Sequence, residues 1–364
     1  MGKLGISIYP ERSTFEKDKA YLDLAHKYGF KRVFTSLLQI NDEKEQVLAD
    51  FKKVVDYANS LELEVMVDIN PALFEQLAIS YDDLSFFHEM GADGVRLDLG
   101  FTGAEEARMT RNPYGIKIEI NMSAGTNYVD NIMSYSPNTD NLLGSHNFYP
   151  HRYSGLSYEH FVACSKKFRK YNLNTMAFVN SHAATFGPWP TQDGLCSLED
   201  HRELEIATQV KHLILTGLID DITIGNAYAS ESELKAMAEA FQSPYPTLKV
   251  DVAEDITEDE RICLFDNLHS YRGDRSAYIL RSTMTRVYYK DKAFPAHNTR
   301  DMTPGDVLID NAGYGQYKGE TQIALKAMKN DGRVNVVGRV SEDELFLLNF
   351  LKPWSDFKLI ENQG

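Results

Sequence analysis

Eight short apolar runs alternate with segments of helical periodicity over the first two-thirds of the chain, and no other feature constrains the fold as strongly. This alternation is typical of repeated strand and helix units that build a parallel sheet. The runs are Leu4–Tyr9, Arg32–Leu37, Glu64–Asn70, Gly94–Gly100, Lys117–Ser123, Leu142–Pro150, Thr175–His182 and Asp221–Ala229. Eight such units predict a (β/α)8 TIM barrel. An open doubly wound sheet is the alternative, but no GxGxxG motif follows any predicted strand.

The predicted helices carry an apolar face that would cover the sheet. In the segment before the third run, Val47, Phe51, Val54, Val55 and Ala58 form one apolar stripe. A helix with such a stripe buries it against the strands and leaves its charged residues in water.

A second domain is expected after residue 243. The segment Ser243-Pro244-Tyr245-Pro246 interrupts the pattern with two prolines, and the long strand and helix rhythm does not resume after it. The strand candidates that follow are Leu248–Val252, Ala277–Arg281, Val287–Tyr289, Asp306–Ile309, Arg333–Arg339 and Phe357–Ile360. We therefore predict a barrel domain over residues 1–243 and a small, mainly antiparallel β domain over residues 244–364.

Charge and cysteine content exclude several classes of protein. A formal net charge of -15 over 364 residues would repel phosphate backbones, so we expect no nucleic-acid partner. The three cysteines form no CxxC pair, which indicates neither a disulfide framework nor a zinc site. The N-terminal apolar run is too short for a signal peptide, and no later run approaches the length of a membrane span. We expect a cytoplasmic protein with no membrane partner.

Three consecutive predicted strands each aim a carboxylate at the barrel interior. Because strand side chains alternate faces, Asp68, Asp98 and Glu119 share the inward face of their strands. Clustered buried carboxylates have separated pKa values, as the acid and the nucleophile or base of a glycosidase require. We predict Glu119 as the acid and Asp98 as the nucleophile or base, with Asp68 in support. Alternatively, Arg96 and Lys117 on the same faces neutralise the three in a salt-bridged interior.

The ends of the other predicted strands are rich in groups that suit a sugar. Amides and carboxylates bind hydroxyl groups, and aromatic rings offer a flat apolar surface. The substrate-binding candidates in the barrel are Ser7, Tyr9, Glu11, Asn121, His146, Asn147, Tyr149, Asn180 and Asn226. A metal site that combines histidines with Asp68 or Asp98 is the alternative, but no HExxH or HxH spacing supports it. We expect neither a metal nor another cofactor.

Four arginines crowd one short stretch of the second domain. They are Arg272, Arg275, Arg281 and Arg286. Guanidinium groups match phosphate oxygens, so this stretch is either a phosphate-recognition patch or solvated surface. We predict Arg272 and Arg281 as phosphate ligands.

Several of these segments together carry a family resemblance. The segments are Gly5-Ile6-Ser7-Ile8-Tyr9-Pro10-Glu11, Asn147-Phe148-Tyr149-Pro150-His151 with Gly155-Leu156, Gly225-Asn226, and Gly305-Asp306-Val307 with Tyr317-Lys318-Gly319-Glu320. They resemble the 6-phospho-N-acetylmuramidase family over nearly the whole chain. The resemblance implies a TIM barrel followed by a cyclophilin-like β domain, and it adds Tyr317 to the substrate-binding candidates.

The resemblance also implies an activity and a substrate. Members of this family cleave N-acetylmuramic acid 6-phosphate from N-acetylglucosamine, in peptidoglycan recycling. The expected partner is therefore a phosphorylated amino-sugar disaccharide, whose 2-acetamido group is an alternative nucleophile. Two other functions stay open at this point: a metal-dependent isomerase or aldolase acting on a sugar phosphate, and a sugar-phosphate binding protein without catalysis.

Overall fold

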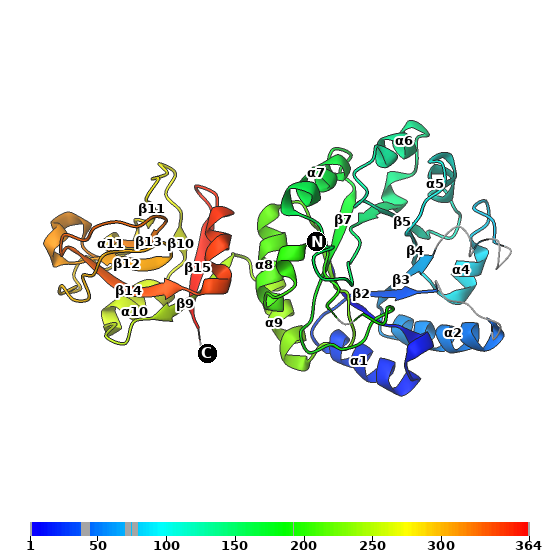
Figure 1. Ribbon diagram of the computed structural model, residues 1–364, viewed down its shortest axis with the longest axis horizontal. Helices are drawn as coiled ribbons and strands as arrows, with labels where there is room; N and C mark the ends of the chain where they lie inside the picture. The colour runs from blue at the N-terminus through cyan, green and yellow to red at the C-terminus, as the bar shows by residue number, and fades with distance from the viewer. Residues whose placement is uncertain (1, 38–43, 70–73, 75–78, 192, 363–364) are drawn as a thin grey trace. The chain divides into compact units, whose positions relative to one another are not determined.

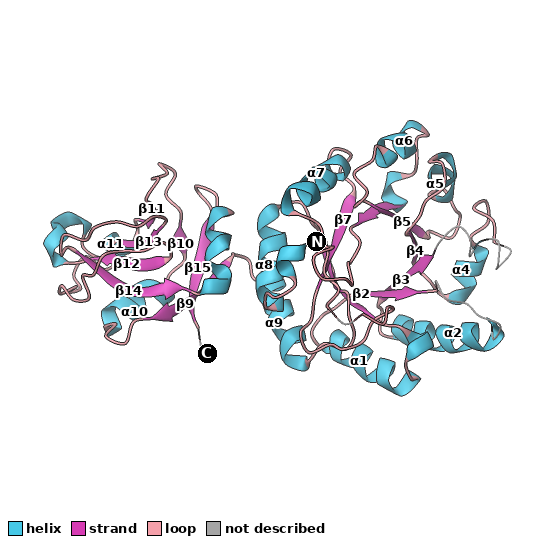
Figure 2. Ribbon diagram, viewed as in Figure 1, coloured by secondary structure: helices cyan, strands magenta, loops and turns pink. Residues whose placement is uncertain are grey.

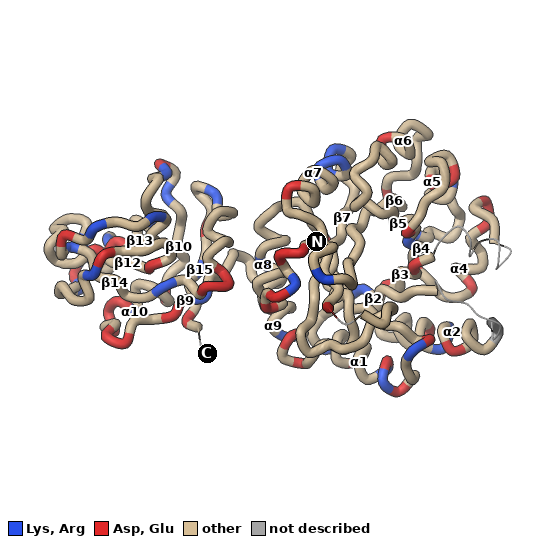
Figure 3. Tube along the Cα trace, viewed as in Figure 1, with Lys and Arg blue, Asp and Glu red and all other residues tan. Residues whose placement is uncertain are grey.

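The computed structural model describes residues 2–37, 44–69, 74, 79–191 and 193–362 of the chain. It divides into two compact units, Met1–Phe241 and Gln242–Gly364, each considered by itself below. Within the described segments, no helix is long and apolar enough to cross a membrane. Figure 3 shows Lys and Arg interspersed with Asp and Glu along outer helices of the first unit, such as α1 and α7.

The first unit is a closed barrel of eight parallel strands, which confirms the predicted TIM barrel. The strands are β1 (Leu4–Ser7), β2 (Arg32–Ser36), β3 (Glu64–Ile69), β4 (Gly94–Leu97), β5 (Lys117–Asn121), β6 (Leu142–Ser145), β7 (Asn174–Val179) and β8 (Asp221–Ile224). Each strand pairs with the next, and β8 pairs with β1 to close the ring (Figure 1). All eight predicted runs contain a strand, but each strand ends before its run does. The last residue of one run, Asn70, lies outside the described residues.

Helices surround the ring of strands, as Figure 2 shows. They are α1 (Phe15–Lys27), α2 (Lys44–Ser60), α4 (Ser85–Met90), α5 (Ala104–Met109), α6 (Tyr128–Ser134), α7 (Tyr158–Arg169), α8 (Ile206–Thr216) and α9 (Glu231–Gln242). The predicted stripe of α2 is the face that packs on the core, with Phe51, Val54, Val55 and Ala58 buried. Hydrophobic burial of such stripes holds the helices on the sheet.

The interior of the barrel changes from charged to aromatic along β2. Arg32, at the amino-terminal end of this strand, is fully buried among carboxylates, and Phe34 follows it on the same face. The ring of Phe34 meets those of Phe148 and Phe178 edge to face, with centroids 6.1 and 5.1 Å away. These aromatic rings fill part of the barrel interior beside the charged groups.

The second unit is a mixed, nearly closed seven-stranded β-barrel. Its strands are β9 (Thr247–Val252), β10 (His269–Ser270), β11 (Ile279–Ser282), β12 (Asp306–Asp310), β13 (Thr321–Ala324), β14 (Val334–Val340) and β15 (Asp356–Glu361), in the order β10-β15-β9-β14-β12-β13-β11. All pairs are antiparallel except β15 with β9. The two end strands approach each other where the His269 imidazole lies 3.0 Å from the Ser282 hydroxyl.

Two helices accompany this sheet, α10 (Glu258–Phe265) and α11 (Thr285–Tyr288). The strand predicted at Val287–Tyr289 is wrong, because α11 covers most of it. The apolar side chains of Val287 and Tyr288 are exposed, so sheet packing does not support the strand propensity of these residue types. The sequence of a run this short does not distinguish a strand from a helix.

Candidate active site

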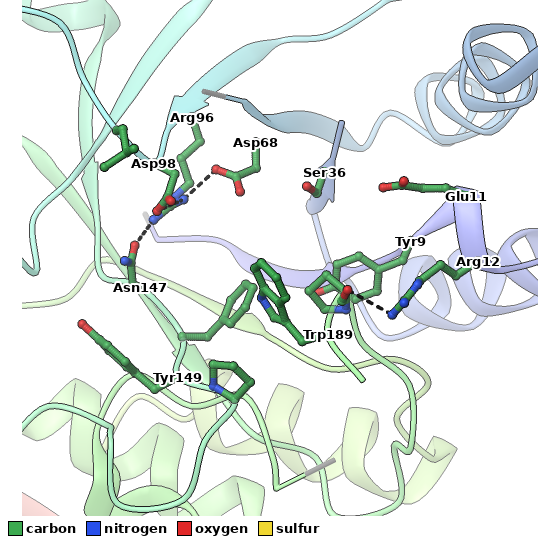
Figure 4. A pocket seen from close by; sticks show the side chains of 14 residues that line it. Tyr9, Glu11, Arg12, Ser36, Asp68, Arg96, Asp98, Asn147, Tyr149 and Trp189 are labelled. Carbon is green, nitrogen blue, oxygen red and sulfur yellow. Dashed lines mark hydrogen bonds and ion pairs between the residues drawn. The ribbon is translucent and has the colours of Figure 1, made fainter. Parts of the chain in front are cut away.

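A pocket of about 470 Å³ opens at the carboxyl ends of the barrel strands (Figure 4). Active sites of TIM barrels lie at this end, and the volume falls within the ~300–1,000 Å³ that is typical of small-molecule sites. Its walls come from β2, β3, β4 and the segments that follow β1, β4, β6 and β7. The lining residues are Tyr9, Glu11, Arg12, Ser36, Asp68, Arg96, Asp98, Leu99, Asn147, Phe148, Tyr149, Pro150, Pro188 and Trp189.

Arg96, from β4, organises the polar floor of this pocket. Its Nη1 lies 2.6 Å from Oδ1 of Asp68 and 3.5 Å from Oδ1 of Asp98. Its Nε donates to the hydroxyl of Ser145 at 2.9 Å, and its Nη2 donates to the side-chain oxygen of Asn147. The guanidinium is therefore saturated with acceptors, and it fixes both aspartates toward one side of the pocket, as Figure 4 shows.

The two aspartates differ in their access to water. The side chain of Asp68 is 6% exposed, whereas that of Asp98 is 39% exposed. Burial raises the pKa of Asp68 to about 6, and the charges of Asp98 and Glu119 add to this rise while Arg96 opposes it. The pocket thus combines a buried carboxyl that keeps its proton up to about pH 6 with a second carboxyl group open to a ligand.

Glu119 lies on the inward face, as predicted, but it does not line the pocket. Its side chain is fully buried and ion-paired with Arg32, which also lies 3.2 Å from Asp221. Arg96 pairs in register with both Asp68 and Glu119, and Asp98 lies two residues further along the chain direction of β4. Because the strands of a closed barrel are tilted, residues in register on different strands lie at different levels. The inward direction of the three carboxylates follows from strand alternation, but their levels in the barrel differ.

Four of the predicted substrate-binding residues line the pocket: Tyr9, Glu11, Asn147 and Tyr149. Tyr9 is buried, and its hydroxyl donates to the Gly225 carbonyl at 2.5 Å. Glu11 stands at the rim, where partial burial raises the pKa of its carboxyl to about 7 and the charge of Arg12 opposes the rise. In Figure 4 its carboxylate points into the pocket, toward the strand that carries Ser36. Glu11, Asn147 and Tyr149 are exposed or half-buried, so these three side chains are accessible to a ligand.

Three other predicted residues hold the barrel together and do not line the pocket. The Ser7 hydroxyl donates to a main-chain carbonyl of β8 at 2.6 Å. The side-chain oxygen of Asn180 accepts from the amide of Leu195 at 3.0 Å, and that of Asn226 accepts from the amide of Ser181 at 2.9 Å. The three side chains fix the segments that leave β7 and β8.

Asn121 and His146 lie in a hydrogen-bonded chain behind the pocket wall. Asn121 Oδ1 accepts from the amide of Ser123 at 2.8 Å. The Ser123 hydroxyl lies 3.1 Å from His146 Nδ1 and accepts from the amide of Asn147, and His146 Nε2 lies 2.9 Å from the hydroxyl of Ser165. Burial lowers the pKa of His146 to about 3, so its ring is neutral. This chain positions Asn147, which binds Arg96.

The remaining predicted residues belong to the second unit. The Nε of Arg281 lies 2.5 Å from Oε1 of the buried Glu320, and Arg272 is ion-paired with Asp274. The Tyr317 ring packs against another guanidinium of this unit, with 4.8 Å between group and centroid. Both arginines therefore already have a carboxylate partner within their own unit.

Arg12 and Trp189 are among the pocket residues that the sequence analysis did not single out. Trp189 is one of two tryptophans, and it lies in the proline-flanked segment that follows the seventh strand. A rare aromatic residue in a segment between two barrel strands is a signal that could have found it. Arg12 comes one residue after the predicted Glu11, in a short 3-10 helix spanning Pro10–Arg12.

Metal ligation was the predicted alternative use of these side chains. Among the residues that the structure describes, no group of three or more His, Cys, Asp or Glu side chains is placed to hold a metal ion.

The chain matches a family of known proteins over both units. Residues 4–239 match the model of the 6-phospho-N-acetylmuramidase N-terminal domain, and residues 246–360 match that of the C-terminal domain. A comparison with curated protein sequences finds no match.

Two solved structures are similar over almost their whole length. A crystal structure of an uncharacterized B. cereus protein shares 47% identity with a TM-score of 0.91, covering 99% of both chains. A conserved protein of unknown function from a locus in Enterococcus faecalis shares 25% identity with a TM-score of 0.77, covering 99% of this chain and 97% of that one. The chain thus belongs to the 6-phospho-N-acetylmuramidase family, which is a family of glycosidases.

Proposed function

We propose that this protein hydrolyses the glycosidic bond between N-acetylmuramic acid 6-phosphate and N-acetylglucosamine, with Asp68 and Asp98 as the reacting carboxylates. The family implies an enzyme that acts on a phosphorylated muramic-acid sugar. The observation that carries the residue assignment is the attachment of both aspartates to one nitrogen of Arg96 in the wall of the barrel pocket. A glycosidase needs two carboxyl groups with different tasks, and this pair differs in burial.

Asp68 is the proton donor in this proposal. Its pKa of about 6 leaves part of the population protonated near neutral pH, and the buried proton has few competing acceptors. The proton passes to the glycosidic oxygen as the bond from that oxygen to the anomeric carbon breaks, so N-acetylglucosamine leaves as an alcohol. The Asp68 carboxylate then takes a proton from the water that completes hydrolysis.

Asp98 faces the anomeric carbon in this scheme. It acts as the nucleophile, or it orients the 2-acetamido oxygen that attacks in its place. The separation of the two carboxylates supports either version over an inverting reaction. Because their oxygens lie 2.6 and 3.5 Å from the same nitrogen, they are no further apart than the sum of those distances. That limit is shorter than the ~6.5–9.5 Å that leaves room for a water in inverting enzymes.

Glu119 has a positioning role in this proposal, which replaces the role of proton donor predicted for it. It is buried against Arg32, and its Oε1 lies 4.0 Å from Nε of Arg96. Its charge thus helps to hold the guanidinium that carries both aspartates. Tyr9, Glu11, Asn147 and Tyr149 are the proposed sugar contacts in the pocket wall.

The test is turnover of the disaccharide with and without its 6-phosphate, followed by mass spectrometry of the products. The proposal expects N-acetylglucosamine and N-acetylmuramic acid 6-phosphate from the phosphorylated substrate. Asp98→Asn removes turnover, whereas Asp82→Asn is the matched control because this exposed aspartate pairs with Arg108 away from the pocket. Equal activity of Asp98→Asn and wild type would refute the assignment.

The same assay separates the two rival functions. A metal-dependent isomerase or aldolase would convert a sugar phosphate without releasing N-acetylglucosamine and would lose activity with a chelator. A binding protein would retain the disaccharide unchanged. Release of N-acetylglucosamine that is insensitive to chelation supports the glycosidase.

The predicted phosphate ligands of the second unit stay part of the proposal as a distinct question. Arg272 and Arg281 each have one nitrogen engaged by a carboxylate. The test is to replace either arginine by glutamine and to measure the preference for the phosphorylated substrate. A lost preference would indicate that this arginine binds the phosphate.

A further inference from the structure

Arg12 is a cation of the pocket wall that pairs with no carboxylate of the described residues. Its Nη1 donates to the carbonyls of Gly187 and Pro188 at 3.1 and 3.0 Å. Among the described residues, no carboxylate oxygen lies within 4.0 Å of its guanidinium. Arg96, the other arginine of the pocket, is bound to Asp68 and lies close to Asp98. Among the described residues, the charge of Arg12 is therefore held by no ion pair, and it acts on the neighbouring Glu11 only at longer range.

The contacts of Arg12 fix the direction of its guanidinium and leave some of its N–H donors without an acceptor among the described residues. Carbonyl groups carry no net charge, so they fix the direction of the group and leave its charge intact. One nitrogen makes both bonds, while no bond to Nε or Nη2 is seen among the described residues. A guanidinium with free donors in a fork matches the oxygens of a phosphate or a carboxylate.

The same contacts hold the segment that carries Trp189. The indole follows directly after Pro188, lines the pocket and is 44% exposed. An exposed indole in a pocket wall offers a flat apolar surface to one face of a sugar ring. Arg12 and Trp189 thus line one pocket, and Arg12 binds the segment that carries the indole.

We propose that Arg12 and Trp189 form the subsite for the sugar that carries the anionic group, with Arg12 bound to that group and Trp189 stacked on the ring. This inference rests on the proposed function for the identity of the sugar. N-acetylmuramic acid 6-phosphate carries two anionic groups, the phosphate and the lactyl carboxylate. Both offer the oxygens that a guanidinium binds, and the experiment distinguishes them.

The test is direct binding of the monosaccharide, measured by calorimetry on the full chain without turnover. Wild type and Arg12→Gln are compared on N-acetylmuramic acid 6-phosphate, on N-acetylmuramic acid, which lacks the phosphate, and on N-acetylglucosamine 6-phosphate, which lacks the lactyl group. Arg111→Gln is the matched control, because Arg111 is exposed, donates to the Ser136 carbonyl and lies outside the pocket.

Arg12→Gln is expected to weaken binding of N-acetylmuramic acid 6-phosphate by about 10- to 100-fold, as the loss of a charge-assisted contact does. If Arg12 binds the phosphate, the variant and wild type bind N-acetylmuramic acid equally. If it binds the lactyl carboxylate, they bind N-acetylglucosamine 6-phosphate equally. Trp189→Ala weakens binding of all three sugars.

Arg12→Lys separates binding from a purely structural role, since it keeps the charge and loses the fork. It is expected to bind the phosphorylated sugar between wild type and Arg12→Gln. An equal loss on all three sugars in Arg12→Gln, or an unchanged affinity for N-acetylmuramic acid 6-phosphate, overturns the inference. The two proposals fail in different ways, because this test measures binding. If wild type hydrolyses the disaccharide but Arg12→Gln binds the sugar normally, the proposed function stands and the inference on Arg12 fails. If wild type binds the sugar through Arg12 but does not hydrolyse the disaccharide, only the proposed function is refuted.

Discussion

Arg96 and Asp68 are directly paired residues of neighbouring strands, and their side chains meet with Nη1 of the arginine 2.6 Å from Oδ1 of the aspartate. Both side chains are buried at the floor of the pocket. A buried carboxyl beside a buried cation can hold or release its proton with a small change in its surroundings. The pairing therefore makes the protonation state of Asp68 central to how the pocket works.

The rate should fall as the pH rises through about 6. In the proposed reaction Asp68 acts in its protonated form, and burial raises its pKa to about 6, so the active fraction declines above that pH. The measurement is the pH profile of kcat/KM on the phosphorylated disaccharide. Asp68→Asn is expected to lower kcat/KM by at least about 100-fold and to remove the decline of the profile above about pH 6. If the decline at high pH persists in Asp68→Asn and disappears in Glu11→Gln, then Glu11 is the proton donor.

Hydrolysis should retain the anomeric configuration. The two carboxylates share one guanidinium nitrogen and are too close for the direct attack of a water between them. Attack by Asp98 or by the acetamido group followed by water gives two inversions and hence net retention. Proton NMR of the first product formed, before mutarotation, measures the outcome. An inverted first product would contradict the proposed roles.

Glu119→Gln should lower the free energy of unfolding on the order of 3 kcal/mol. The substitution removes the charge that faces the buried Arg32 and leaves a cation with less compensation in the barrel interior. Urea denaturation measures this, with Glu203→Gln as the control because that exposed glutamate pairs with Arg152 at the surface. Folded Glu119→Gln should lose part of its kcat, because Arg96 loses a charge that helps to hold it, but it should lose less than Asp98→Asn does. A fully folded and inactive variant would instead restore the catalytic role predicted for Glu119.

Asp310→Asn should change how the stability of the second unit depends on pH. Burial, together with the nearby Glu320, raises the pKa of Asp310 from 3.8 to about 7. The folded state therefore keeps a proton that the unfolded chain has already lost, and stability falls as pH rises from about 4 to about 7. The variant lacks this loss, so it should gain stability over wild type with rising pH, by a difference on the order of 4 kcal/mol at pH 8. If urea denaturation of the two proteins depends on pH in the same way, the pKa of the Asp310 carboxyl is not raised in the folded state.

The barrel could be predicted from sequence because its signal is repeated eight times. Each strand lies between helices and bears a run of apolar residues, so errors in single boundaries do not change the fold. The second unit gave weaker signals. Its strands are as short as the two residues of β10, and β13 (Thr321–Ala324) starts with two polar residues, so neither appeared among the predicted strands.

The sequence predicts which way the site carboxylates point, but it does not predict how deep in the barrel each of them lies. Alternation along a strand shows that Asp68, Asp98 and Glu119 face inward, but the stagger between strands decides which of them reaches the mouth. That stagger is a property of the closed sheet. Arg12 was missed for a related reason, since segments outside the strands bring it to the Gly187 and Pro188 carbonyls and the local sequence carries no sign of that contact.

The charged cluster of Arg32, Glu119 and Asp221 fills the barrel at the level where β2 begins, and Glu119 reaches from it to within 4.0 Å of Nε of Arg96 in the pocket floor. Arg32 and Glu119 are fully buried, so among the described residues the floor of the pocket rests on packed ionic groups and not on solvent. A sugar that meets Asp68 and Asp98 in the proposed reaction must therefore approach from the carboxyl ends of the strands.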